Sequence, residues 1–146
     1  MVAFSFNVVI IPLIVFVIAQ GAKFLTKSLR GFNWRNLSAY GGMPSAHTAI
    51  TTSMATLAGL IDGFNSVTFM IATVLAVIII RDAMGFRMNL SQQGKVLNKL
   101  IKEVDGIDRQ KYPALGERLG HTGGEVFVGV LVGIGATYLL YSLMVV

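Results

Sequence analysis

The amino-acid sequence predicts an all-α integral membrane protein: a helical bundle with about four transmembrane helices plus an amphipathic cytoplasmic helix. Three observations lead to this fold class. Of the 146 residues 54% are hydrophobic and only 13% are charged, against roughly a quarter charged in an ordinary soluble domain. The apolar residues gather in four stretches, and all twelve Lys and Arg residues fall in two separate windows. The length suits one membrane-embedded domain over residues 1–146.

The four apolar stretches supply the transmembrane helices. Val126–Val146 has no charged residue in 21 positions, about the length that crosses the bilayer core. The other three run over about Val8–Ala19, Thr48–Ile61 and Val67–Ile80 and are shorter. They must recruit flanking polar residues or bury their ends in protein, because lipid offers no hydrogen bonds to an exposed backbone.

The positions of the positive charges predict the topology. With four spans, the basic loops 20–46 and 81–120 lie on the same side of the membrane, whereas Asp62–Ser66 and both chain ends carry no Lys or Arg. The positive-inside rule then gives a multi-pass protein of the cell membrane with both basic loops cytoplasmic and both termini outside. Because the membrane explains the basic charge, we expect lipid and no nucleic acid as a partner.

The remaining segment with a helical pattern is Met88–Val104. Its apolar residues recur at helical spacing, and lysines occupy its other faces. This pattern suits an amphipathic helix on the inner leaflet. It suits equally a helix packed on the rest of the protein, and the sequence leaves both placements open.

The first of the two histidines lies in the segment 41–48, GGMPSAHT, where a basic loop meets an apolar helix. Gly42 permits an unusual backbone path, and Pro44 suits the first turn of a helix. The positive end of that helix would attract an anion, Ser45 adds a hydroxyl donor, and His47 can exchange a proton near neutral pH. The same residues also fit a plain helix start with a capping hydroxyl.

The second histidine lies in the segment 119–125, LGHTGGE. If the segment is helical, His121 and Glu125 share a face. The carboxylate would then fix the tautomer of the imidazole and leave its other nitrogen as a nucleophile or base. The alternative is a surface pair of little energetic value. Glu125 borders the uncharged stretch, where a charged carboxylate is energetically unfavourable unless it has a function. Its position therefore favours a functional site.

Basic residues complete the candidate site. Lys23 and Arg30 are seven residues apart, so on a helix they point the same way and could clamp a phosphate. The alternative is an ordinary positive-inside flank. Asp82 follows the third apolar stretch, between Arg81 and Arg87. It either pairs with an arginine for structural reasons or lines the same site.

Together these residues resemble the type-2 phosphatidic acid phosphatase superfamily, which shares its fold and site with vanadium haloperoxidases. The signature of that superfamily is KxxxxxxRP, then PSGH, then SRxxxxxHxxxD. Residues 23–31, 44–47 and 121–125 match it in order, with Gly31, Ala46 and Glu125 in place of the proline, glycine and final aspartate. The runs GGMPSAHTA, RDAMGFR, QQGKVLNKL and LGHTGGEVFVG look like the divergent branch of acid phosphatase/vanadium-dependent haloperoxidase-related membrane proteins, and this likeness covers nearly the whole chain.

The resemblance implies a role for each matching residue. His121 would be the nucleophile that forms a phosphohistidine, held by Glu125, and His47 would protonate the leaving oxygen. The implied ligands of the phosphoryl oxygens are Lys23, Arg30, Ser45 and the Gly42 region. The implied activity is metal-independent and cofactor-free hydrolysis of a phosphorylated lipid, a phosphate or a diphosphate, at the cytoplasmic face.

The chain departs from the signature at one position that matters for catalysis. Leu115 stands where the third motif has an arginine, and Arg118 or Arg87 would have to replace it. This loss motivates a second hypothesis, a catalytically inactive protein of the same fold that binds phosphate headgroups or assists membrane assembly. The superfamily core usually has about six helices, so a homodimer could complete the enclosure. A small transporter is a weaker reading, since four short spans provide little pathway.

Overall fold

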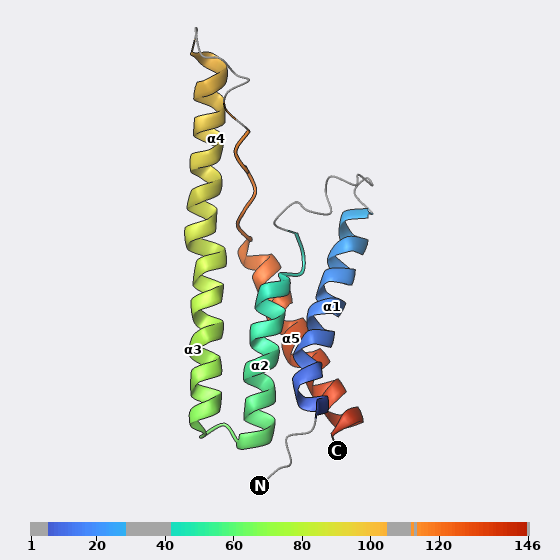
Figure 1. The fold of residues 1–146 in the computed structure, drawn as a ribbon. Coiled ribbons are helices and arrows are strands. Elements are labelled where there is room, and N and C mark those ends of the chain that lie inside the picture. The colour runs from blue at the N-terminus through green and yellow to red at the C-terminus, as the bar shows by residue number, and fades with distance from the viewer. Residues whose placement is uncertain (1–5, 29–41, 105–111, 113, 146) are drawn as a thin grey trace.

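The computed structural model describes residues 6–28, 42–104, 112 and 114–145, and all regular elements within these ranges are helical (Figure 1). The prediction of an all-α membrane bundle is therefore confirmed. In chain order the elements are α1 (Phe6–Ser28), α2 (Ala46–Asp62), α3 (Val67–Arg81), the π-helical turn η2 (Asp82–Phe86), α4 (Arg87–Glu103) and α5 (Gly123–Met144).

Three helices of the described part are long and apolar enough to cross a membrane: α1 over Val8–Thr26, the continuous helix Val67–Glu103, and α5. The first predicted stretch is completed by flanking residues, because α1 runs on to Ser28. The fourth predicted span, α2, has only 17 residues. It is shorter than the roughly 20 residues that a full crossing needs.

Helix α2 lies at the centre of the bundle and contacts α1, α3 and α5. Apart from Leu57, its buried residues are small or carry a hydroxyl group: Ala46, Thr48, Ala49, Thr51, Ser53, Ala55 and the glycine at position 59. In α3, by contrast, Ala76 is the buried residue, and large apolar side chains such as Met70 and Ile78 are exposed. This arrangement is typical of membrane bundles, where small residues let helices approach and large apolar residues face lipid.

The start of α1 and the end of α5 lie at the opposite end of the bundle from the histidine segments (Figure 1). At one end α1 begins, α5 ends, and a short turn with Gly63 in the left-handed region (φ +90°) joins α2 to α3. Ser66 caps α3 there by accepting a hydrogen bond from the Phe69 N–H. At the other end lie the C-terminal turns of α1, the start of α2, η2 and the start of α5. The described residues of both basic windows reach this second end, as the sequence predicts.

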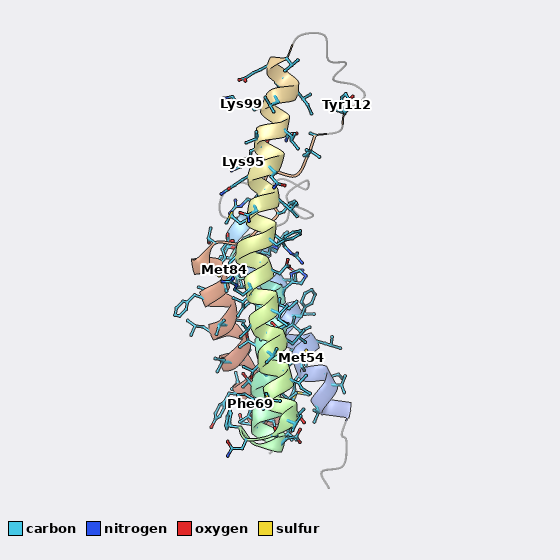
Figure 2. All side chains as sticks on the ribbon, turned by 90° about the vertical axis from the view of Figure 1, so that its left-hand side faces the viewer. Met54, Phe69, Met84, Lys95, Lys99 and Tyr112 are labelled. Carbon is cyan, nitrogen blue, oxygen red and sulfur yellow. The ribbon has the colours of Figure 1, made fainter. Side chains whose placement is uncertain are left out.

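Helix α4 continues the axis of α3 through η2, and the three form one unbroken helix of 37 residues (Figure 2). It stands beyond the ends of α1, α2 and α5 (Figure 1). Of the two predicted placements for this segment, packing on the rest of the protein is therefore the one observed. The contact is made with residues 114–120, hereafter the connector, through Ser91, Gly94 and Asn98, which are buried. The predicted position flat on the leaflet does not fit a helix that runs straight on from α3.

Candidate active site

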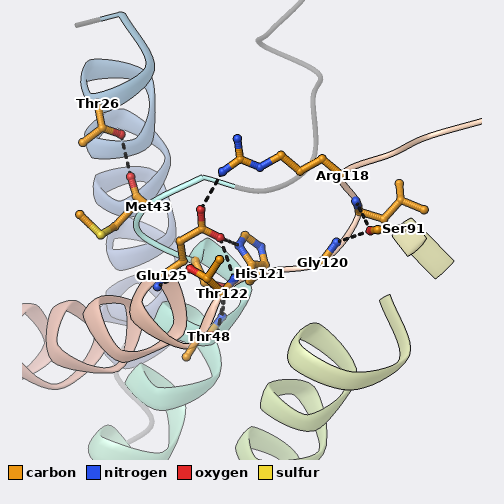
Figure 3. A network of polar contacts seen from close by, with 11 residues as sticks. Thr26, Met43, Thr48, Ser91, Arg118, Gly120, His121, Thr122 and Glu125 are labelled. Carbon is orange, nitrogen blue, oxygen red and sulfur yellow. Dashed lines mark hydrogen bonds and ion pairs between the residues drawn. The ribbon is translucent and has the colours of Figure 1, made fainter. Parts of the chain in front are cut away.

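The two histidine segments, far apart in the sequence, are joined directly by a backbone hydrogen bond. The Ser45 N–H donates to the Glu125 carbonyl oxygen over 3.0 Å. On the other side, the Thr26 hydroxyl of α1 donates to the Met43 carbonyl oxygen over 2.7 Å (Figure 3). The loop before α2 is thus held between α1 and α5.

Ser45 is the N-cap of α2, so the helix begins at Ala46 and not at Pro44 as the sequence suggested. Proline fits a first helical turn, but the serine one residue later offers the hydroxyl that the free N–H groups need. Ser45 Oγ accepts from the Thr48 N–H (3.5 Å) and the Thr48 hydroxyl (2.9 Å), and both side chains are fully buried. Gly42 lies in the left-handed region (φ +107°), which explains a glycine there.

Glu125 organises the second histidine segment, although in a different way from that predicted. His121 is not helical, because Thr122 is the N-cap of α5. Instead Glu125 reaches back as part of a capping box: its Oε2 accepts from the Thr122 N–H (3.1 Å) and lies 3.2 Å from His121 Nδ1. A carboxylate only accepts hydrogen bonds, so Nδ1 carries the proton and Nε2 keeps its lone pair. The carboxylate is almost completely buried.

The π-helical turn η2 fixes the backbone of His121. In an α-helix the Arg87 N–H would donate to the Ala83 carbonyl oxygen, but here it donates to the Asp82 carbonyl oxygen. The Ala83 carbonyl oxygen accepts instead from the His121 N–H over 3.0 Å. Single π-turns inside α-helices often mark functional sites, and this one docks a candidate nucleophile.

Helix α4 fixes the connector that leads into His121. The buried Ser91 hydroxyl accepts from the N–H groups of Leu119 (2.8 Å) and Gly120 (3.2 Å), as Figure 3 shows. Asn98 donates to the Leu115 carbonyl oxygen and accepts from the Leu115 N–H, both over 2.9 Å. Gly120 lies so close to α4 that a Cβ there would come within 2.8 Å of a backbone nitrogen. These contacts have no signal in the sequence, because each joins segments separated by 17 to 29 positions.

Small residues on α5 let it approach the start of α2. A Cβ on Gly129 would lie 2.7 Å from the Ser45 carbonyl oxygen, and one on Gly133 would lie 2.6 Å from the Ala49 carbonyl oxygen. One turn further, the Thr137 hydroxyl donates to Ser53 Oγ over 2.6 Å. Sequence reasoning missed this contact, but the spacing of four between the two glycines is a known helix-pairing motif that would have revealed it.

Several predicted cations converge on the histidines. Arg118 Nη2 donates to Glu125 Oε1 over 3.1 Å while most of its side chain is exposed. Arg87 Nε donates to Asp82 Oδ2 over 2.6 Å. Lys23, on α1, is close enough for its charge to act on both histidines. Arg30 lies outside the described residues.

Electrostatics place His47 and His121 in one neighbourhood. Burial lowers the pKa of His121, and the charges of Lys23 and His47 lower it further, while Glu125 acts in the opposite direction. Partial burial also lowers the pKa of His47, assisted by Arg87 and Lys23 and opposed by Asp82. Asp82 pairs with Arg87, and its charge also acts on His47. Both pKa values are thus lowered from the ordinary value of a histidine, which favours the neutral imidazole in each case.

Comparison with known proteins identifies the family. The profile of the divergent PAP2 (type-2 phosphatidic acid phosphatase) family matches residues 4–136. The chain belongs to the divergent PAP2 family. The chain is similar to the uncharacterized membrane protein YuiD of Bacillus subtilis (strain 168), with 34% identity over an alignment of 122 residues. The alignment covers 76% of this chain and 77% of that protein. No solved structure matches the chain. In this divergent PAP2 protein the matched region contains both histidine segments.

Proposed function

We propose that the chain is an integral-membrane phosphatase that hydrolyses a lipid phosphate or diphosphate through a phosphohistidine at His121. The observation that carries this proposal is the 3.0 Å hydrogen bond from the Ser45 N–H to the Glu125 carbonyl oxygen. It joins the histidine segments through their backbones, so a donor, an acid and a nucleophile are held at one end of the bundle. Family membership supports the reaction class, and the local chemistry supports the roles.

In the first step His121 Nε2 attacks the phosphorus atom, and the bond from phosphorus to the lipid oxygen breaks. Glu125 supports the positive charge that develops on the imidazole, because its carboxylate lies 3.2 Å from Nδ1. His47 donates a proton to the leaving oxygen. The His47 side chain is exposed at the start of α2, where a substrate can reach it.

In the second step water attacks the phosphohistidine, His47 takes a proton from that water, and the bond from Nε2 to phosphorus breaks. Negative charge on the phosphoryl oxygens is stabilised in both steps by Lys23, Arg87 and Arg118 and by the positive end of α2. Arg30, Ser45 and Gly42 remain predicted ligands of the same group. Arg87 and Arg118 together take the place of the third-motif arginine, at whose position this chain has Leu115.

The position of the site favours a lipid substrate. The histidines lie at the ends of helices that face lipid along their sides, so a headgroup can reach them while its chains stay in the bilayer. Described residues of both basic windows lie at this end, and by the positive-inside rule we place it, with its site, in the cytoplasm and the two termini outside.

Phosphate release from purified protein tests the proposal. We expect inorganic phosphate from at least one lipid phosphate or lipid diphosphate in mixed micelles, with EDTA present, and inhibition by vanadate, which mimics a five-coordinate phosphoryl group. Phosphoserine, which lacks acyl chains, serves as the matched control and should react far more slowly. Absence of release from every lipid in the panel would contradict the proposal.

The pH dependence follows from the two lowered pKa values. His121 must be neutral to attack, and His47 must be protonated to act as an acid. The product of these two fractions is largest midway between the two pKa values, and each lies below 6.5. We therefore expect the maximum of kcat/KM on the acid side of pH 6.5. Because the chain has only two histidines, an NMR titration can check both directly, and an optimum above pH 7 would count against these roles.

A second candidate function rests on Leu115, which stands where the third motif has an arginine, and on the engagement of Arg118 with Glu125. If these changes remove too much positive charge from the site, the protein binds phosphate headgroups without hydrolysing them. Saturable vanadate binding with no phosphate release would favour this candidate, and turnover would exclude it.

A further inference from the structure

Helix α4 presents two different faces. Its small and polar face, with Ser91, Gly94 and Asn98, packs on the connector. A second face carries large apolar side chains that contact little in the described part of the chain: Leu97 is 47% exposed and Leu100 is 49% exposed. Lipid or another protein segment is expected to cover this apolar stripe, because contiguous apolar surface of this kind is rare on proteins in water.

The exposed side chains follow the spacing of a coiled coil. Counting along the helix from Phe86, the successive steps are four, three, four, three and four residues, which is the alternation of positions a and d in a heptad. Five of these six positions are apolar and exposed, and the sixth is a glutamine. The seam, as we call it here, consists of Phe86, Leu90, Gln93, Leu97, Leu100 and Val104.

Lipid cannot be the cover along most of the seam. The continuous helix of 37 residues is about 55 Å long, whereas the bilayer core is about 30 Å thick and takes about 20 residues. If the helix enters the hydrocarbon core at Val67, about 20 residues cross it, and the helix leaves the core near Phe86. The remaining 17 residues of α4 therefore stand outside the bilayer along the direction of α3 (Figure 2), so the cover must be protein.

The charges of α4 are placed to allow two copies to pair. In the heptad register of the seam, Lys95 and Lys102 fall at position f and Lys99 at position c, away from the partner helix. Of the flanking positions e and g, four hold uncharged residues: Asn89, Gly94, Val96 and Ile101. The other two hold charges of opposite sign, Arg87 at e and Glu103 at g. A chain with a net charge of +5 can thus approach its own copy here without bringing lysines face to face.

We propose that α4 forms a parallel two-stranded coiled coil with α4 of a second copy of this chain. Two copies in one bilayer with the same topology have parallel α4 helices, so each seam residue faces its own counterpart. Gln93 would face the partner's Gln93, and such a polar residue in a seam fixes register. The seam spans less than three heptads, and shared orientation in the membrane raises the effective concentration that lets so short a coiled coil form.

Single-cysteine cross-linking tests this interface, because the chain has no cysteine of its own and each variant has one thiol. In native membranes, Leu97→Cys and Leu100→Cys should give a disulfide-linked dimer on mild oxidation. Lys95→Cys and Lys99→Cys, on the same helix but off the seam, should give about tenfold less. Equal cross-linking on both faces, or no cross-linking on the seam, would overturn the proposal. A seam cysteine that is protected from a thiol reagent but forms no disulfide counts as no cross-linking.

The mass of the detergent-solubilised protein supplies a second measurement. We expect a dimer, converted to a monomer by Leu97→Glu with Leu100→Glu, because four carboxylates would then meet in the seam. Lys95→Glu with Lys99→Glu also places two new carboxylates on each α4, but off the seam, and should remain dimeric. A monomeric unmodified chain, or a dimer that survives the seam substitutions, would overturn the assignment of this interface.

Discussion

Replacing His121 with alanine is expected to reduce phosphate release by about 10³-fold or more, because removal of a nucleophile leaves only binding and charge stabilisation to act. The substitution removes Nε2 and the ring that Glu125 orients over 3.2 Å. The backbone contact of His121 N–H with the Ala83 carbonyl oxygen is retained, so the connector should keep its path. Phosphate release per mole of purified, folded protein is the measurement.

Two matched variants separate chemistry from folding. Thr122→Ser retains the hydroxyl of the N-cap beside His121 and should keep most of the activity. Glu125→Gln keeps an acceptor oxygen for the capping box but loses the charge that supports a cationic imidazole, so it should be intermediate. A His121→Ala protein that releases phosphate at an unchanged rate would rule out the nucleophile and, with it, the phosphohistidine.

Substitution of Gly129 by valine is expected to destabilise the bundle and disrupt the site together. A Cβ at this position would lie 2.7 Å from the Ser45 carbonyl oxygen and 3.3 Å from Ser45 Cβ. Since a backbone atom cannot rotate away, α2 and α5 must separate, and overpacking of this kind costs about 1–3 kcal/mol or more. The separation would also stretch the hydrogen bond from the Ser45 N–H to the Glu125 carbonyl oxygen. Thermal unfolding in detergent and phosphate release measure the two effects.

Gly135 provides the matched control on the same helix. A Cβ there would meet no atom within 4 Å, so Gly135→Val changes intrinsic helix propensity in the same way without the clash. We expect Gly135→Val to retain the unfolding temperature and activity of the unchanged chain. If Gly129→Val behaved like Gly135→Val, close packing of α5 on α2 would not be what joins the histidine segments.

Much of the fold could be predicted from the sequence because membrane helices follow local composition. The uncharged stretch Val126–Val146 corresponds to α5. The helix begins earlier than predicted, at Gly123, because Thr122 and Glu125 form a capping box. The apolar run at Val8–Ala19 became a longer helix, since residues as far as Ser28 continue it. The short stretch Thr48–Ile61 became α2, whose 17 residues suit the centre of a bundle better than a full span.

The candidate site was predicted in part. Its chemistry depends on residue types, so His47, His121 and Glu125 could be singled out from their motifs. Their arrangement could not, because the sequence suggested a helical pair at His121 where the structure has a capping carboxylate reaching back. Lys23, Arg87 and Arg118 could equally have been flanking charges. Only their positions around the histidines favour a role in the site.

By itself, the sequence determined the class of protein, the helices and the end of the bundle where the basic residues gather, because hydropathy and charge act locally along the chain. The tertiary structure decided the contacts that assemble the site. The Ser45 N–H donates to the Glu125 carbonyl oxygen, and the His121 N–H donates to the Ala83 carbonyl oxygen that the π-turn leaves without a helical partner. The Leu119 N–H of the connector donates to the Ser91 hydroxyl. The first two bonds join backbone groups that every residue possesses, and the third joins a serine hydroxyl to a backbone N–H group. No residue type marks them in advance, and they exist only once the helices have packed.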